Sequence, residues 1–312
     1  MTHRVWLPFV DVDAATRALG PLPTGIEADC FLGRGDEPAS IAEMDLLVAP
    51  YMVPAPAVLA RVDEMVGLRA ILVQLAGYDN FLPLLPPGVQ LCNAAGVHDA
   101  STAELAVGLT LANNRHLDRY ARLMESGTWG ADTSVSLADR RVLILGYGHI
   151  GRAIAARLEP FEVSITRVAS KARIEDGHEV HGVDELHALL PQTDVLILIT
   201  PLTPQTRHLI GGYELALLPD DALVVNMCRG PVVDTDALVA ATASGRIRAS
   251  LDVTDPEPLP PDHPLWRTPG VLISPHVGGQ SSAFPPRTNK LIAAQLRRWA
   301  AGEPLANIVA VG

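Results

Sequence analysis

The sequence has few of the features that mark secreted or membrane-spanning proteins. Its 312 residues include only three cysteines, Cys30, Cys92 and Cys228, which are scattered and form no Cys-x-x-Cys pair. Such a set fits free thiols in a reducing compartment rather than a disulfide framework. No apolar run approaches the roughly 18 residues of a membrane span. The first 17 residues, interrupted by Pro8 and Asp11, lack the apolar core of a signal peptide. We therefore expect a cytoplasmic protein without a membrane partner.

Positive charge is also scarce. The chain has 24 Lys and Arg residues against 35 Asp and Glu residues, for a net charge of −11. Surfaces that bind nucleic acid need clustered cations, so this balance argues against nucleic acid as a partner. Hydrophobic residues at 48% and charged residues at 19% describe an ordinary globular protein. At about 150 residues per domain, the length predicts two domains.

A glycine-rich turn at Gly146-Tyr147-Gly148-His149-Ile150-Gly151 is the most informative stretch. An apolar segment at 141–145 predicts a buried strand before it, and the segment 152–159 predicts a helix after it. Glycine lets the backbone approach a pyrophosphate, and the start of a helix offers unpaired N–H groups. The pattern favours a nucleotide-phosphate site over a purely structural turn. The His149 side chain could contact the pyrophosphate or face solvent.

Alternating strands and helices surround this turn. Before it, apolar runs at 4–9, 45–49, 70–75 and 89–92 and a helical pattern at 56–66 indicate a small α/β unit. Ser101 and Glu104 have the spacing of a capping box, with a single long helix predicted over 105–124. After the turn, strands are predicted at 162–168, 194–199, 222–226, 249–253 and 271–274, and helices include 183–190, 235–244 and 286–301. This pattern predicts a parallel sheet covered on both faces.

Three consecutive predicted strands end in residues that suit acid-base chemistry. They are followed by Arg229, Glu257 and His276. In a doubly wound sheet, ligands bind beyond the carboxyl ends of the strands, where these residues would lie. Arg229 suits a carboxylate or a polarised carbonyl, His276 suits proton transfer, and Glu257 would favour the charged form of the imidazole.

Five motifs, in order and spacing, resemble those of the D-isomer-specific 2-hydroxyacid dehydrogenases, and the resemblance covers essentially the whole chain. The motifs are Gly146-x-Gly148-x-Ile150-Gly151, Pro201-Leu202-Thr203-Pro204-Gln205-Thr206, Asn226-x-x-Arg229-Gly230, Leu251-Asp252-Val253 with Glu257-Pro258, and Pro275-His276-Val277-Gly278-Gly279. The resemblance implies two doubly wound, Rossmann-like α/β domains separated by a cleft. A flavodoxin-like substrate domain would comprise residues 1–97 and 286–312, and an NAD(P)-binding domain residues 98–285. It also implies a homodimer formed through the central domain.

The resemblance further implies hydride transfer between a nicotinamide cofactor and a small 2-oxo or 2-hydroxy acid. Arg229 would bind and polarise the oxo acid, His276 would donate the proton on reduction, and Glu257 would support His276. Backbone groups at Leu75, Ala76 and Gly77 would hold the substrate carboxylate, and Tyr51 and Met52 would shape the pocket. The residues implied around the cofactor are Thr102, Gly146, Tyr147, Gly148, His149, Ile150, Gly151, Thr200, Pro201, Thr206, Met227, Cys228, Arg229, Asp252, His276 and Gly278.

The end of the second strand of the central domain indicates which dinucleotide is used. NAD-preferring enzymes usually place an acidic residue there to bind the ribose 2′-hydroxyl. Here the strand is followed by Ser170, Lys171 and Arg173, a hydroxyl and two cations. These groups suit a 2′-phosphate, so we expect NADP, with NAD as the alternative if the cations are only solvated surface charges.

The sequence is compatible with several functions. The leading hypothesis is an NADPH-dependent reductase of the glyoxylate or hydroxypyruvate type, and the nearest alternative is an NAD-dependent D-2-hydroxyacid dehydrogenase. Phosphite oxidation is disfavoured because those enzymes carry lysine where Ala76 stands, and formate oxidation because those enzymes carry glutamine where Glu257 stands. A dinucleotide-sensing corepressor is a further alternative. The run His178-Glu179-Val180-His181 has the wrong spacing for a helical zinc motif, and we expect no metal.

Overall fold

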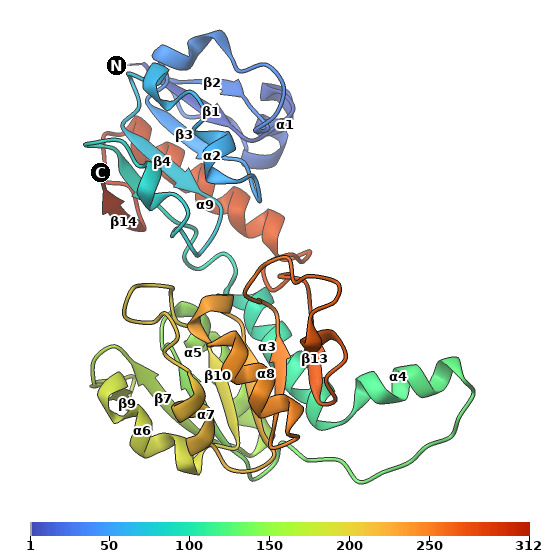
Figure 1. Cartoon of the computed structure of the whole chain (residues 1–312). Coiled ribbons are helices and arrows are strands. Elements are labelled where there is room, and N and C mark those ends of the chain that lie inside the picture. Colours follow the sequence, from blue (N-terminus) through green and yellow to red (C-terminus); the bar gives the residue numbers. More distant parts are fainter. Residues whose placement is uncertain (1) are drawn as a thin grey trace. The chain divides into compact units, whose positions relative to one another are not determined.

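The computed structural model describes residues 2–312 and divides the chain into two compact units. Unit 1 comprises residues 1–98 and 282–312, and unit 2 comprises residues 99–281. The sequence-based boundaries lie after residues 97 and 285, close to these positions. Both units are α/β, and Figure 1 shows each sheet with helices on both of its faces. Within residues 2–312, no helix is long and apolar enough to cross a membrane.

Unit 2 is built on an eight-stranded sheet. The strand order is β13-β12-β11-β10-β6-β7-β9-β8, and all pairs are parallel except β8 with β9. Its strands are β6 (Arg141–Leu145), β7 (Ser164–Ala169), β8 (Arg173–Glu175), β9 (His178–Gly182), β10 (Val195–Leu198), β11 (Ala222–Asn226), β12 (Ile247–Leu251) and β13 (Val271–Ile273). The order reverses between β6 and β10, which is where a doubly wound sheet of this kind binds dinucleotides.

Helices cover both faces of this sheet. They are α3 (Asp99–Asn114), α4 (Leu117–Glu125), α5 (His149–Leu158), α6 (Leu186–Leu189), α7 (Gly212–Leu217) and α8 (Thr235–Ala243). Short 3₁₀ turns lie at Glu159–Phe161, Val183–Glu185, Leu190–Gln192, Gly230–Val232 and Pro264–Trp266. Strand residues alternate between two cores: Val142 and Ile144 pack with α3 and α5, whereas Leu143 and Leu145 pack with α6, α7 and α8. This alternation is the period-2 geometry of a strand with both faces buried.

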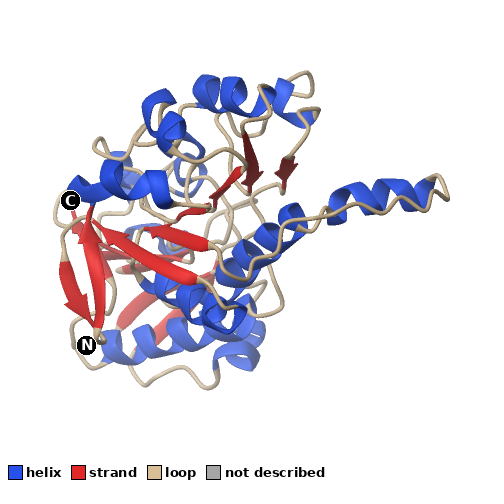
Figure 2. Cartoon of the chain, turned by 90° about the horizontal axis from the view of Figure 1, so that it is seen from below, coloured by secondary structure: helices blue, strands red, loops and turns tan. Residues whose placement is uncertain are grey.

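Unit 1 contains a six-stranded sheet in the order β14-β5-β4-β3-β1-β2. Its strands are β1 (His3–Leu7), β2 (Ile26–Cys30), β3 (Leu46–Ala49), β4 (Ala70–Val73), β5 (Gln90–Cys92) and β14 (Ile308–Val311), and its helices are α1 (Val12–Leu19), α2 (Ala55–Val58) and α9 (Phe284–Ala300). Turns of 3₁₀ type lie at Ala39–Ala42, Val62–Glu64 and Leu82–Leu84. The five N-terminal strands are parallel and follow the flavodoxin-like order 2-1-3-4-5, and β14 pairs antiparallel with β5. Helices and strands alternate along most of both units (Figure 2).

Two sequence-based helix predictions are wrong in their extent. The helix predicted over 105–124 is two helices, because His116 takes a left-handed conformation (φ 54°) between α3 and α4. The capping box at Ser101 and Glu104 is also wrong, since α3 already begins at Asp99. Ser101 Oγ instead lies 2.6 Å from Ser281 Oγ, and joins the start of α3 to the end of unit 2.

The helix predicted over 56–66 is likewise wrong. Only α2 forms there, followed by a 3₁₀ turn, because the backbone leaves the helical region at Leu59 and Arg61. This break lets both Leu59 and Met65 be buried against the sheet. The sequence patterns also missed β2, β8, β9 and β14, whose residues are mixed or largely polar rather than continuous apolar runs. The β8–β9 hairpin turns at Asp176-Gly177, both with positive φ.

Candidate active site

The glycine turn connects β6 to α5, and its geometry fits a dinucleotide. Gly146 has φ +112°, and a Cβ there would lie 2.5 Å from the Ile199 carbonyl oxygen. A Cβ on Gly151 would lie 2.1 Å from the Gly146 carbonyl oxygen. Gly146 therefore lets the turn pack against the segment after β10, and Gly151 lets the first turn of α5 pack against the Gly146 carbonyl. A Cβ on Gly148 would meet nothing within 4 Å, so the turn has open space on that side.

The start of α5 supplies the other half of a phosphate site. Gly148 is the N-cap, and no side chain caps the helix, so its first N–H groups remain for a ligand. Ile150 packs against the core, and so does the Tyr147 ring, whose hydroxyl accepts a 3.0 Å hydrogen bond from Arg167. The His149 side chain is 61% exposed, and its Nδ1 lies 3.6 Å from Asp99. The backbone of this turn, rather than its side chains, therefore suits the pyrophosphate.

Cations gather beside the glycine turn, at the end of β7. Ser170, Lys171 and Arg173 are exposed there. The Arg173 guanidinium donates a 3.0 Å hydrogen bond to the Tyr147 carbonyl oxygen, which ties the β8–β9 hairpin to the turn. Arg173 also pairs with Glu175, at 2.6 Å, and Arg152 at the start of α5 pairs with the same carboxylate.

Glu175 is a carboxylate close to the end of β7 that the sequence analysis did not predict there. The hydrogen bond from Arg173, together with the charge of Arg152, holds the pKa of Glu175 below its ordinary value. Glu175 is therefore ionised at neutral pH, and it balances one of the two arginine charges. The pair of arginines keeps a net positive charge beside the glycine turn.

The segment after β10 folds back on itself. Thr206 Oγ1 donates a 2.7 Å hydrogen bond to the Pro201 carbonyl oxygen and accepts one of 2.8 Å from the Thr203 N–H. Thr206 thus stabilises this loop. Thr200 is adjacent to Ile199, against which Gly146 packs, and so lies next to the glycine turn.

The loop after β11 is shaped by Asn226. This buried side chain accepts a 3.1 Å hydrogen bond from the Cys228 N–H and donates one of 3.1 Å to the Arg229 carbonyl oxygen. Burial raises the pKa of the Cys228 thiol to about 11, so Cys228 is neutral and poorly nucleophilic at pH 7. A Cβ on Gly230 would lie 1.9 Å from the Thr254 carbonyl oxygen. Only glycine therefore lets this loop, which carries Arg229, pack on the loop that follows β12.

Glu257 and His276 form a pair at the ends of β12 and β13. His276 Nδ1 lies 2.6 Å from Glu257 Oε1. Because a carboxylate only accepts, Nδ1 carries the proton and Nε2 is left for a substrate. Burial acts to raise the pKa of Glu257, but the hydrogen bond from His276 and the charges of His276 and Arg229 outweigh it, so the pKa of Glu257 is lowered. The structure thus brings Arg229, Glu257 and His276 together, as the sequence predicts.

Asp252 anchors the loop that carries His276. Its side chain is 3% exposed and accepts hydrogen bonds from Ser274 Oγ at 2.6 Å and from the N–H groups of Val277 and Gly278 at 2.9 Å each. Its carbonyl oxygen accepts from the His276 N–H at 2.7 Å. His276 itself has φ +52°, a conformation that costs energy for a non-glycine residue and needs such support.

The surroundings of Gly278 bring together several residues predicted to contact the cofactor. A Cβ there would lie 2.8 Å from Asp252 Oδ2, 3.4 Å from Met227 and 3.5 Å from Thr102. Gly278 therefore allows α3, the loop after β11 and the histidine loop to approach one another. The family resemblance implies that Asp252 lies near the cofactor, and its hydrogen bonds show that it also positions the histidine loop.

Unit 1 carries the predicted substrate residues. Three consecutive carbonyl oxygens after β4 accept hydrogen bonds: Gln74 from His98 Nε2 at 2.8 Å, Leu75 from the Ala94 N–H at 2.9 Å, and Ala76 from Asn93 Nδ2 at 2.7 Å. These hydrogen bonds run through the carbonyl oxygens and fix the backbone of the loop that contains Ala76 and Gly77. No sequence motif pointed to His98 in this role.

Tyr51 and Met52 follow β3. The Tyr51 ring stacks on Phe284, with centroids 4.1 Å apart, and on His98 at 6.0 Å. Burial raises the pKa of Tyr51, so its hydroxyl remains protonated. Met52 is exposed and has φ 60°. The Tyr51 ring is thus held in place by its stacking within unit 1, whereas the Met52 side chain is exposed.

The fold and site of unit 2 define a dinucleotide-dependent oxidoreductase: a doubly wound sheet with a phosphate-binding turn and an acid-base pair at the same carboxyl edge. Residues 107–278 match the family model described as D-isomer specific 2-hydroxyacid dehydrogenase, NAD binding domain. The chain belongs to this family. It is an NAD(P)-dependent enzyme of the D-2-hydroxyacid dehydrogenase and reductase type.

Individual relatives agree with this assignment. A glyoxylate reductase of Korarchaeum cryptofilum is 32% identical over 320 residues, which cover 96% of this chain and 95% of the relative. Among solved structures, a D-isomer specific 2-hydroxyacid dehydrogenase from Xanthobacter autotrophicus Py2, in complex with NADPH and MES, matches with a TM-score of 0.82 and 28% identity, covering 99% and 98% of the two chains. An NADPH-dependent glyoxylate/hydroxypyruvate reductase from Sinorhizobium meliloti, in complex with NADP and malonate, matches with a TM-score of 0.80 and 28% identity over 99% and 97%.

Proposed function

We propose that this chain is a reductase of small 2-oxo acids that uses NADPH, of the glyoxylate/hydroxypyruvate type. The observation that carries the proposal is the 2.6 Å pair of His276 and Glu257 in the unit that also carries the glycine turn. The carboxylate accepts from Nδ1, which leaves Nε2 as the ring nitrogen that can deliver a proton to a substrate.

Each residue has a role in this reaction. The bound nicotinamide supplies the hydride. Arg229 binds the oxo acid and polarises its carbonyl, for which a planar guanidinium with several donors is suited. His276 donates a proton from Nε2 to the carbonyl oxygen, and Glu257 stabilises the imidazolium through Nδ1. Backbone N–H groups of Leu75, Ala76 and Gly77 hold the substrate carboxylate.

NADP is the proposed cofactor because of the groups at the end of β7. Ser170, Lys171 and Arg173 offer a hydroxyl and two cations, and the hydrogen bond from Arg173 to the Tyr147 carbonyl keeps one cation against the glycine turn. Glu175 fixes Arg173 but offsets part of its charge. The Xanthobacter and Sinorhizobium structures contain NADPH and NADP, which supports the same choice.

A steady-state assay tests this proposal. Glyoxylate, hydroxypyruvate and pyruvate would each be offered with NADPH and with NADH, and cofactor oxidation would be followed by absorbance. We expect reduction of at least one of these acids, with kcat/KM higher for NADPH. A clear preference for NADH would contradict the cofactor assignment, and no turnover of any 2-oxo acid would contradict the reaction.

We also propose that the protein is a cytoplasmic homodimer. In unit 2, α4 and the segment after it extend away from the sheet in both views (Figures 1 and 2). This arm exposes Leu117, Met124 and Trp129, at 52%, 81% and 96%. Apolar side chains so exposed suit burial in a second copy. Light scattering should give twice the chain mass, and Trp129→Glu should lower it; a monomeric wild type would refute the dimer.

A further inference from the structure

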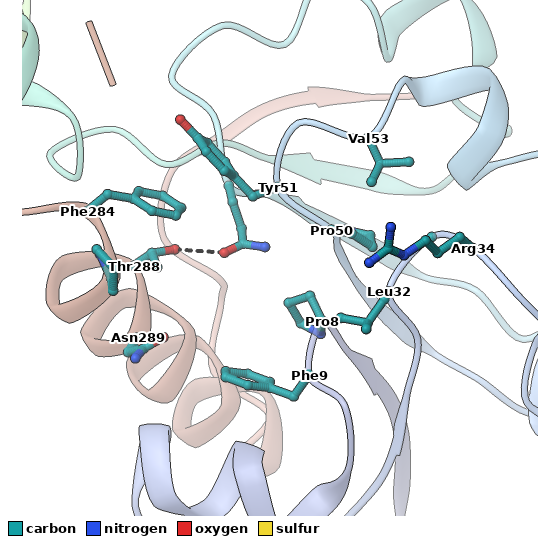
Figure 3. A pocket seen from close by; sticks show the side chains of 13 residues that line it. Pro8, Phe9, Leu32, Arg34, Pro50, Tyr51, Val53, Phe284, Thr288 and Asn289 are labelled. Carbon is teal, nitrogen blue, oxygen red and sulfur yellow. Dashed lines mark hydrogen bonds between the residues drawn. The ribbon is translucent and has the colours of Figure 1, made fainter. Parts of the chain in front are cut away.

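Unit 1 contains a pocket next to the loop proposed to hold the substrate carboxylate, and Tyr51 is part of its wall. Its volume is about 540 Å³, and Figure 3 shows the 13 residues that line it. Most of the wall is apolar, with Phe9, Leu32 and Val53 on the strand side and Phe284 at the start of α9. This volume is in the range of cavities that hold small organic ligands.

The pocket lies where the topology of the sheet predicts a ligand. Its walls come from the segments just after β1, β2, β3 and β4. The strand order of unit 1 reverses between β1 and β3, and open α/β sheets bind ligands beyond the carboxyl ends of the strands at such a point. The location therefore indicates a binding site rather than a packing defect.

The pocket floor is rigid. Gln74, buried at the end of β4, donates a 2.9 Å hydrogen bond to the Ala49 carbonyl oxygen and accepts one of 3.1 Å from Thr288 on α9. The dashed line in Figure 3 marks the second of these bonds. Gln74 is also followed directly by Leu75, so the pocket adjoins the loop proposed to hold the substrate carboxylate.

Arg34 is the one ionised side chain among the lining residues. It is exposed, and Figure 3 shows its guanidinium beside Pro50 at the pocket wall. With no acidic residue in the lining, the pocket favours an anion at this point. The chemistry that complements it is an apolar chain ending in a carboxylate.

The spacing suits one molecule that contacts both the loop after β4 and Arg34. Figure 3 shows the Arg34 guanidinium beside Pro50, which follows β3, and β3 is the neighbour of β4, about 4.8 Å away. An extended chain advances about 3.5 Å every three bonds, so a six-carbon diacid spans roughly 6 Å between its carboxyl carbons. Glyoxylate, which has no side chain, would not reach Arg34.

We propose that this pocket binds the distal part of a longer substrate, a 2-oxo acid with an apolar chain and a terminal carboxylate, and that Arg34 recognises that carboxylate. The inference rests on the proposed 2-oxo acid reductase function and specifies its substrate class. It makes Arg34 a specificity-determining residue.

Matched substrates test the inference. 2-Oxoadipate and 2-oxohexanoate have the same chain length, but the first ends in a carboxylate and the second in a methyl group. We expect the wild type to reduce 2-oxoadipate with the higher kcat/KM, by about tenfold or more, the value of one charge-assisted hydrogen bond. Arg34→Gln should abolish this preference. Arg17→Gln, which removes an equally exposed charge from α1 outside the pocket, should retain it.

Adipate, which lacks the reacting carbonyl, provides a second readout. It should inhibit competitively with 2-oxoadipate, and Arg34→Gln should weaken that inhibition. Non-competitive inhibition would indicate a separate effector site and contradict the proposal. Equal kcat/KM for the two acids in the wild type would also contradict it while leaving the reductase function intact. If no 2-oxo acid, glyoxylate included, is reduced, both the proposed function and this inference fail.

Discussion

Replacing Asp252 by Asn tests whether the histidine loop is held by one buried carboxylate. The substitution keeps the shape of the side chain and the Oδ1 acceptor for Ser274 and Val277. In place of Oδ2 it puts an amide NH₂ toward the Gly278 N–H, so two donors face each other. Losing a hydrogen bond to a charged buried group costs about 1.5–3 kcal/mol.

That cost acts on the His276 loop, whose left-handed backbone already depends on support. If about 2 kcal/mol of loop stability is lost, the equilibrium constant for forming the productive loop falls roughly 30-fold. We therefore expect kcat for 2-oxo acid reduction to fall by as much as that factor in Asp252→Asn, while the dissociation constant for NADPH changes much less.

The assay combines steady-state kinetics with cofactor titration by fluorescence, well below the melting temperature of the variant. Asp262→Asn, at an exposed acid outside the site, is the control for loss of one negative charge. A wild-type kcat in Asp252→Asn would refute the reasoning. An equal loss of kcat in Asp262→Asn would also refute it.

Two other predictions follow from the charges of the site. Glu257→Gln keeps an oxygen that can accept from His276 Nδ1 but removes the negative charge beside the ring, so kcat for reduction should fall; an unchanged kcat would exclude the pairing. Since the pKa of Glu257 is lowered in the folded state, its stabilising effect is present above the ordinary carboxyl pKa and lost as pH falls through the lowered value. The melting temperatures of wild type and Glu257→Gln should therefore converge in acid. Arg173→Gln should reduce the ratio of kcat/KM for NADPH to that for NADH by about tenfold, because a 2′-phosphate loses one charge-assisted bond; an unchanged ratio would assign this contact to other residues.

Much of the nucleotide-binding unit could be predicted from the sequence because its signals are local. The strand β6, its glycine turn and α5 are consecutive, and each glycine is explained by a close backbone approach or open space in the turn. Arg229, Glu257 and His276 each follow a strand, and a parallel sheet brings strand ends together. Spacing alone was therefore sufficient to place these three residues at one edge.

What the sequence could not show depends on contacts between distant residues. Glu175 reaches Arg152 and Arg173 only because a polar hairpin, β8–β9, folds back on the sheet. The break between α3 and α4 at His116 has no proline or glycine to signal it. The pocket around Arg34 combines four strand ends with α9, more than 200 residues further along the chain, so no local pattern predicts it.

The central claim is that His276 is the acid that protonates the substrate during reduction. The most direct test is His276→Ala, measured as kcat for NADPH-dependent reduction of the best 2-oxo acid, together with the dissociation constant for NADPH. General acid catalysis contributes about 10²–10⁴ in rate, so we predict a loss of kcat in that range with NADPH affinity nearly unchanged. Turnover close to that of the wild type would contradict the account.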